Sequence, residues 1–376
     1  MTNATVEPAG LAPSSQTTPP VRRRRGWVFA AAGAVVIALM VTLIVIVTRP
    51  HPFTASDARR VGLTVMVGDT VFLPNGTTTT LGVRADAISD LTAIPGAYLA
   101  AVDEPFADTD LVIIYPGGSG GDIAKSIDSN FEVSADGRIA VVRSVDAENN
   151  IALRSIDIET SAQLHTYGDG NQHVIAVRGD WALISDDGDS SSSPPSVVWN
   201  IRTGAVVPFA SSVGVVAWGV TPDGEVLRSI DAEHAPPLSP TSTSTRACYD
   251  LVAPDHTAKP AVIPTNPTGY CGRLDVTDAT MSPDGSWVVL IPTNQSPGHG
   301  VVAVRTADLH DGRWAPVNLD QADGMSRPLF WDSPTSFIAP YTNDAGDAGY
   351  ERCSVDGWCH DLGIPEAAVI VRSLGG

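Results

Sequence analysis

The sequence predicts an all-β fold made of repeated units, preceded by one membrane-spanning helix. A four-residue turn recurs between short apolar runs, most clearly at residues 134–137, 221–224 and 282–285. The three copies read Ser-Ala-Asp-Gly, Thr-Pro-Asp-Gly and Ser-Pro-Asp-Gly, residues that suit a type I turn closed by a glycine with positive φ. Strand, tight turn and strand, repeated roughly every 40 residues, are typical of a β-propeller.

The N-terminal region carries the membrane signal. Residues 1–25 are rich in Pro, Ser and Thr and end in four consecutive arginines, so we expect a disordered cytoplasmic tail. Residues 26–48 contain no charged side chain, and this run is long enough to cross a ~30 Å hydrocarbon core. We interpret it as a permanent signal anchor, because the apolar region of a cleaved signal peptide is shorter, at about 7–15 residues. Residues 49–60 are then a linker, and residues 61–376 form the extracytoplasmic propeller.

The repeats indicate the number of blades. Six units are expected at 86–122, 127–168, 172–210, 213–264, 275–320 and 325–364. Residues 62–83 and a C-terminal strand at 367–372 remain. A seventh blade built from both ends would close the ring and remove an exposed sheet edge. We therefore predict seven blades, with six as the alternative.

The Ser/Thr-Pro-Asp-Gly turns, with a strand, turn and strand ending each unit, resemble TolB-type β-propeller repeats, which are relatives of the WD-repeat propellers. The resemblance covers roughly residues 61–376. It departs from the family where an aromatic residue often precedes the turn, since Val133, Val220 and Met281 stand there. TolB is a periplasmic partner-binding protein of the cell envelope, so the resemblance implies a propeller that binds an envelope partner. The expected membrane anchor and the lack of TolB's N-terminal domain set this chain apart.

All four cysteines lie in the C-terminal half of the chain, at positions 248, 271, 353 and 359. An even number of cysteines in an exported domain favours disulfides. Pairing by proximity gives Cys248–Cys271 and Cys353–Cys359. A zinc site made from cysteines and His360 is the alternative, although no Cys-x-x-Cys spacing is present.

The charge is unevenly distributed. Residues 1–60 carry seven arginines and two acidic residues, so the remainder of this chain of net charge −19 carries −24. Such an acidic domain would repel nucleic acid, which excludes nucleic-acid binding. The acidity otherwise favours solubility.

Several candidate sites have simpler structural explanations. Residues 117–121 fit the Gly-x-Ser-x-Gly pattern around Ser119, but that pattern is catalytic only where a strand passes into a helix. Residues 124–126 narrowly miss a P-loop because Ala124 replaces the required glycine. Acidic clusters at 103–110, 186–189 and 343–347 lack EF-hand spacing and are most simply solvated loops.

Seven tryptophans lie on or beside strands, where core packing is expected, although one or two of them could line a carbohydrate-stacking face. These are Trp181, Trp199, Trp218, Trp287, Trp314, Trp331 and Trp358.

The sequence therefore assigns no catalytic, cofactor-binding or metal-binding residue. It favours a non-catalytic binding or scaffold propeller, anchored in the bacterial cell membrane and engaging an envelope protein or a small ligand. An exported propeller enzyme of hydrolase or lactonase type is the alternative, because propellers host both. The insertion at 234–271 is the predicted contact region.

Overall fold

The computed structural model divides into two units, Met1–Pro52 and Phe53–Gly376. Apart from residue 52, the described residues all belong to the second unit. They are residues 52–103, 108–145, 148–168, 172–186, 196–210, 215–230, 247–264, 270–272, 276–292, 301–313, 315–319, 330–342, 348–365 and 367–374. The predicted tail and anchor, residues 1–48, lie outside them. Within the described part of the chain, no helix has the length and apolar character needed to cross a membrane.

Helices are few and short in the described residues. Helix α2 (Ala55–Val61) begins at a capping box, in which Thr54 and Asp57 each bond the other's backbone N–H, and ends at Gly62 with φ 70°. The remaining helical segments are η1 (Ala85–Ala87) and α3 (Thr306–His310). The domain is otherwise β-structure, as the sequence predicts.

The first two sheets hold both ends of the domain. One has four strands, in the order β27 (Val369–Ile370), β1 (Val65–Val67), β2 (Thr70–Phe72) and β3 (Thr78–Thr80). The other has eight, in the order β10 (Ala162–Tyr167), β9 (Ile151–Asp157), β8 (Ile139–Val145), β7 (Gly120–Val133), β6 (Thr109–Ile114), β5 (Ala97–Asp103), β4 (Ile88–Ile94) and β28 (Arg372–Ser373).

Four further sheets have four strands each, in sequence order. The first consists of β11 (Gln172–Arg178), β12 (Trp181–Asp186), β13 (Val197–Asn200) and β14 (Val206–Pro208), and the second of β15 (Val215–Val220), β16 (Val226–Ile230), β17 (Ala247–Val252) and β18 (Tyr270–Gly272). The third consists of β19 (Val276–Met281), β20 (Trp287–Pro292), β21 (Val302–Arg305) and β22 (Val317–Asn318). The fourth consists of β23 (Phe330–Ser333), β24 (Ser336–Thr342), β25 (Ala348–Ser354) and β26 (Cys359–Asp361).

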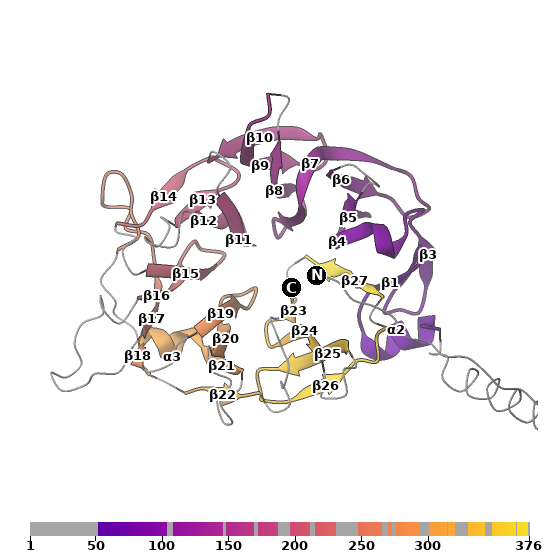
Figure 1. The fold of residues 1–376 in the computed structure, drawn as a ribbon. Coiled ribbons are helices and arrows are strands. Elements are labelled where there is room, and N and C mark those ends of the chain that lie inside the picture. Colours follow the sequence, from indigo (N-terminus) through magenta and orange to yellow (C-terminus); the bar gives the residue numbers. More distant parts are fainter. Residues whose placement is uncertain are drawn as a thin grey trace, which may run out of the picture. The chain divides into compact units, whose positions relative to one another are not determined.

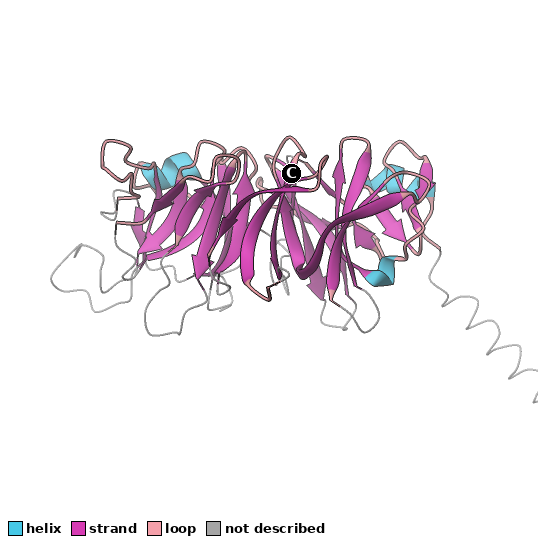
Figure 2. Cartoon of the chain, turned by 90° about the horizontal axis from the view of Figure 1, so that it is seen from above, coloured by secondary structure: helices cyan, strands magenta, loops and turns pink. Residues whose placement is uncertain are grey.

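The sheets are arranged around a central axis as in a β-propeller, with the first strand of each four-stranded group nearest the centre (Figure 1). Seen from the side, the strands cross the thickness of the ring and the turns gather at its two faces (Figure 2). Apolar side chains of neighbouring sheets pack against one another, as where Trp331 joins a core with Val289 and Val301. The core therefore lies between the sheets.

Strand β7 is shared by two groups of strands. Its first part pairs with β6 and its last part with β8, and the pairing with β8 is irregular between Ile127 and Phe131. This single long strand is what joins eight strands into one sheet.

The two ends of the domain close the ring. Strand β27 pairs antiparallel with β1, bringing Ile370 opposite Val65. Strand β28 then runs parallel to β4, with Arg372 opposite Thr92. The C-terminal strand thus pairs with the segment near residue 65, as the sequence predicts.

The repeated turns form as expected and touch one another along the ring. In the turn at residues 282–285, the Ser282 hydroxyl donates to Asp284 at 2.7 Å, and Gly285 has φ 72°. A Cβ built on Gly285 would meet Cγ2 of Thr221, in the turn of the preceding unit, at 2.8 Å. Glycine is therefore required both by the positive φ and by the close approach of the neighbouring turn.

Candidate functional site

Charged side chains from three strands converge where the ring closes. Arg372 on β28 forms ion pairs with Asp90 on β4 and with Glu132 on β7, the latter at 3.2 Å. The same guanidinium donates to the Phe131 carbonyl at 2.8 Å and lies over the Phe131 ring, 5.3 Å from its centroid. This charged cluster therefore ties the C-terminal strand to two strands of the eight-stranded sheet.

A second arginine lies near this cluster. Arg178 on β11 donates to the backbone carbonyls of Val177 at 2.8 Å and of Met281, on β19, at 3.3 Å. Burial lowers the pKa of Arg178, an effect that Glu132 opposes and Arg372 reinforces. The bond to Met281 joins two sheets that are separated by the intervening β15–β18 sheet.

Burial shifts the pKa values of Asp90 and Arg372 in this cluster. Burial raises the pKa of Asp90 to about 6, and the attraction of Arg372 offsets only part of this rise. Burial also acts to lower the pKa of Arg372, but Asp90 and Glu132 hold it above its ordinary value. Both carboxylates thus face a permanent cation, which makes the cluster an ion-pair network that closes the ring.

The serine that fits the nucleophile pattern lies in a β-hairpin. Residues 115–119 turn between β6 and β7, with the Tyr115 N–H bonded to the Ser119 carbonyl at 2.7 Å. Gly117 and Gly118 both have positive φ, at 97° and 86°. Because an antiparallel strand and not a helix follows Ser119, the geometry of a nucleophile elbow is missing at this position.

The acidic clusters are described only in part. Within the first, the Asp110 carboxylate accepts from the Lys125 ammonium at 3.0 Å and from the Ser126 backbone N–H at 3.1 Å. Asp110 therefore ties β6 to β7 and is occupied by protein donors. Residues 104–107, 187–190 and 343–347 lie outside the described residues.

The cysteines near the C-terminus form a disulfide. Cys353 on β25 and Cys359 on β26 are bonded, with an S–S distance of 2.02 Å, which is the predicted pairing. His360 lies one residue from Cys359 and so points to the other face of the strand. The zinc alternative is therefore wrong for these two cysteines.

The other predicted pair is partly described. Cys248 is disulfide-bonded, and the register of β17 and β18 places Cys271 directly opposite it. The side chain of Cys271 lies outside the described ones, so the Cys248–Cys271 bond stays a prediction.

The tryptophans divide between the core and the surface. Trp199 and Trp331 are buried, Trp218 donates to the Ser229 hydroxyl at 2.8 Å, and Trp287 lies beneath Arg305. By contrast, Trp358 is 54% exposed. Trp181 packs against a core cluster, and Trp314 lies outside the described residues.

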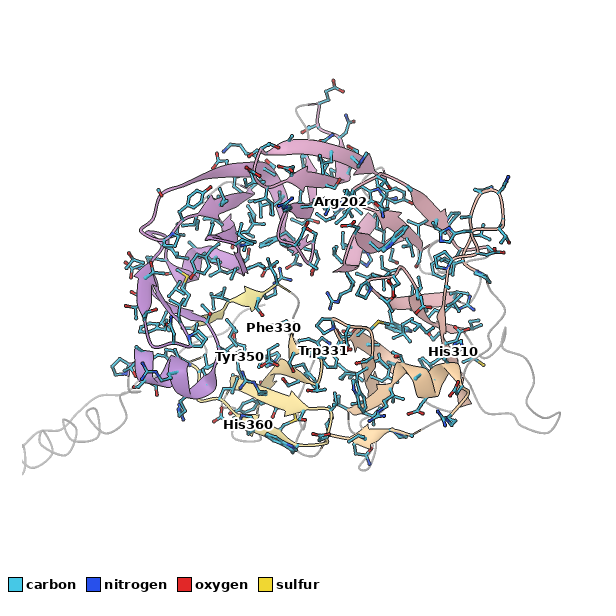
Figure 3. The ribbon with its side chains drawn as sticks, turned by 180° about the vertical axis from the view of Figure 1, so that it is seen from behind. Arg202, His310, Phe330, Trp331, Tyr350 and His360 are labelled. Atoms are coloured by element: carbon cyan, nitrogen blue, oxygen red, sulfur yellow. A yellow bond between two sulfur atoms is a disulfide. The ribbon has the colours of Figure 1, made fainter. Side chains whose placement is uncertain are left out.

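The exposed Trp358 forms an aromatic surface with its neighbour. Its ring stacks on His360, with centroids 5.1 Å apart and planes inclined by 28°. His360 lies at the outer rim of the ring, on β26, whereas Trp331 lies further in (Figure 3). The Cys353–Cys359 disulfide braces this hairpin, so the stacked pair is held on a fixed support. The sequence could not distinguish this tryptophan from the core ones, because all of them lie on or beside strands.

The predicted contact region, residues 234–271, is not a free insertion. It contains β17, whose Asp250 accepts two hydrogen bonds from Arg228 on β16, at 2.7 and 3.0 Å. Further along, Ile263 is fully buried and bonds Pro208 and Ala210 through its backbone. Deleting the whole segment would therefore remove a core strand and the buried partner of Arg228. Residues 231–246 lie outside the described residues.

Comparisons with known proteins bear on the fold. No protein-family model matches the sequence, and no curated protein matches it. An oligogalacturonate lyase in complex with manganese superposes with a TM-score of 0.51 at 9% identity, over 82% of this chain and 88% of that chain. The β-propeller domain of the Trilobed protease from Pyrococcus furiosus superposes with a TM-score of 0.49 at 12% identity, over 73% of this chain and 84% of that chain.

TolB from Acinetobacter baumannii is also similar, with a TM-score of 0.39 at 15% identity, over 71% of this chain and 60% of that chain. This chain thus spans less than two thirds of that TolB. At these identities the likenesses concern the fold alone, and they include both TolB and enzymes.

Proposed function

We propose that this protein is a membrane-anchored, extracytoplasmic propeller that binds a cell-envelope partner or ligand without catalysing a reaction. Its ring has seven blades when β7 is counted as the outermost strand of one blade and the innermost strand of the next. The observation that carries the binding role is the stacked Trp358–His360 pair. A large aromatic side chain on a rigid, solvent-facing hairpin is the kind of anchor that dominates binding energy at interfaces.

The charged cluster supports this role over the enzyme alternative. An exported propeller hydrolase would need polar groups near the central axis that are free to act on a substrate. Asp90 and Glu132 are instead engaged by Arg372, which uses them to join strands. The alternative is tested directly by incubating the purified protein with ester and lactone substrates, where turnover abolished by Ser119→Ala would establish it.

The binding role is tested by crosslinking in native membranes followed by pull-down. Trp358→Ala should weaken capture of the partner, by about 30-fold if Trp358 contributes the ~2 kcal/mol typical of an interface hot spot. Tyr115→Ala is the matched control, because Tyr115 is also an exposed aromatic residue but lies in the β6–β7 turn. Unchanged capture by Trp358→Ala would refute this contact site.

The membrane topology rests on the uncharged run at 26–48 and the arginines before it. Protease added to intact spheroplasts should digest residues 61–376 and leave the N-terminal tail. Protection of the C-terminal domain would place it on the cytoplasmic side and remove the basis for an envelope partner.

A further inference from the structure

The hairpin that carries the disulfide also carries a buried carboxyl group. Strands β25 and β26 place Cys353 opposite Cys359 and Glu351 opposite Asp361. Because side chains alternate along a strand, these four residues lie on one face of the hairpin. A carboxylate oxygen of Glu351 and the two sulfur atoms all lie within 4.8 Å of one another.

The Glu351 carboxyl group is poorly satisfied. Its residue is only 6% exposed, and its Oε1 atom accepts no hydrogen bond from any described residue. Leaving a buried polar atom without a partner costs about 1–3 kcal/mol, so it calls for an explanation. Burial, reinforced by the negative charge of Asp361, raises the pKa of Glu351 to about 7.

Few other charged groups face this carboxyl. Strand β24 places Ala339 opposite Glu351, with Phe337 and Tyr341 on the same side. The neighbouring sheet contributes apolar residues to this face, including Val301 and Leu319. Arg352 and His360 lie on the opposite face of the hairpin. Among the described residues, the titratable groups on Glu351's face of β24–β26 are therefore Asp361 and Tyr341.

We propose that the Cys353–Cys359 disulfide is a thiol–disulfide exchange site for an external dithiol. Glu351 is positioned to donate a proton to the leaving sulfur of Cys353. This inference goes beyond the proposed binding role and does not depend on it. This proposal also explains the unpartnered Oε1 atom of Glu351. When the disulfide is reduced, that oxygen can accept a hydrogen bond from a cysteine S–H.

The exchange consists of two successive displacements at sulfur. A thiolate of the dithiol attacks Sγ of Cys359, because Cys359 is 8% exposed as a residue and Cys353 is 0% exposed, and the Cys353–Cys359 bond breaks. The Cys353 sulfur leaves with the electron pair and takes the proton of the Glu351 carboxyl group. The second thiol of the reagent loses its proton to water and, as a thiolate, attacks the reagent sulfur that is bonded to Cys359. Cys359 leaves with the electron pair and takes a proton from water. The dithiol is oxidised to a disulfide and the protein is reduced by two electrons.

Dithiothreitol is a suitable probe, used on the purified full chain in detergent between pH 6 and 8. Free thiols are alkylated at intervals, and mass mapping identifies the peptides that contain Cys353 and Cys359. Each rate constant is divided by the fraction of the reagent present as thiolate. For the wild-type protein this normalised rate should fall about tenfold from pH 6 to pH 8, since a carboxyl group with a pKa of about 7 loses its proton over that range.

Two variants separate the role of Glu351 from a general effect on the fold. Glu351→Gln should react more slowly than wild type at pH 6, and its normalised rate should not change with pH. Asp361→Asn should keep the fall but move its midpoint to lower pH, because a neighbouring negative charge has been removed. A flat wild-type profile, a fall that persists in Glu351→Gln, or a disulfide that resists reduction in the folded protein would each overturn the proposal.

Discussion

The Arg228–Asp250 pair offers the sharpest test of what stabilises this ring. Both side chains are fully buried, and the guanidinium reaches the carboxylate through two hydrogen bonds of 2.7 and 3.0 Å. Arg228 also donates to the Pro264 carbonyl, which fixes the segment that follows β17. Replacing Arg228 with alanine leaves a buried carboxylate without its cation, and removing one partner of such a pair costs about 3–5 kcal/mol.

Urea unfolding followed by tryptophan fluorescence measures this cost. Arg228→Ala should lower the free energy of unfolding by about 3–5 kcal/mol, whereas the double variant Arg228→Met/Asp250→Leu should be much closer to wild type, because no charge is then left buried alone. Arg84→Ala is the matched control, since the Arg84–Asp86 pair is 76% and 65% exposed and should contribute about 0–1 kcal/mol. A loss below about 1 kcal/mol in Arg228→Ala would refute the reasoning.

Three further outcomes are expected. Gly285→Ala should lower the free energy of unfolding by at least about 1 kcal/mol, because φ is 72° and the new Cβ has no room; unchanged urea midpoints would contradict this. Because the pKa of Asp90 is raised from 3.8 to about 6, its contribution to stability is complete below pH 4 and is lost as the pH rises through 6. Wild-type stability relative to Asp90→Asn should therefore fall by about 2–3 kcal/mol between pH 4 and pH 7, and parallel pH profiles would argue against it. Mass mapping of unreduced peptides should join Cys248 to Cys271, and alkylation of either cysteine without reductant would exclude that bond.

The sequence by itself determined the local structure of this protein. The turns at residues 134–137 and 282–285 form as predicted, because hydroxyl, aspartate and glycine act within a few residues of one another. The β-rich architecture follows from strand-length apolar runs between those turns. The pairing of Cys353 with Cys359 was predictable for the same reason, since the two residues flank one hairpin.

Only the tertiary structure decided which residues meet across the ring. Arg372 lies 282 residues after Asp90 along the chain, and no local pattern marks them as partners. The role of Asp250 was hidden as well, because no local pattern links it to Arg228, whereas burial of the ion pair between them makes the strand part of the core. The distinction between Trp358 and the buried tryptophans likewise depends on which face of a sheet is covered. Burial and long-range pairing arise only when the sheets pack together, so they leave no signature at the spacing of a strand or a turn.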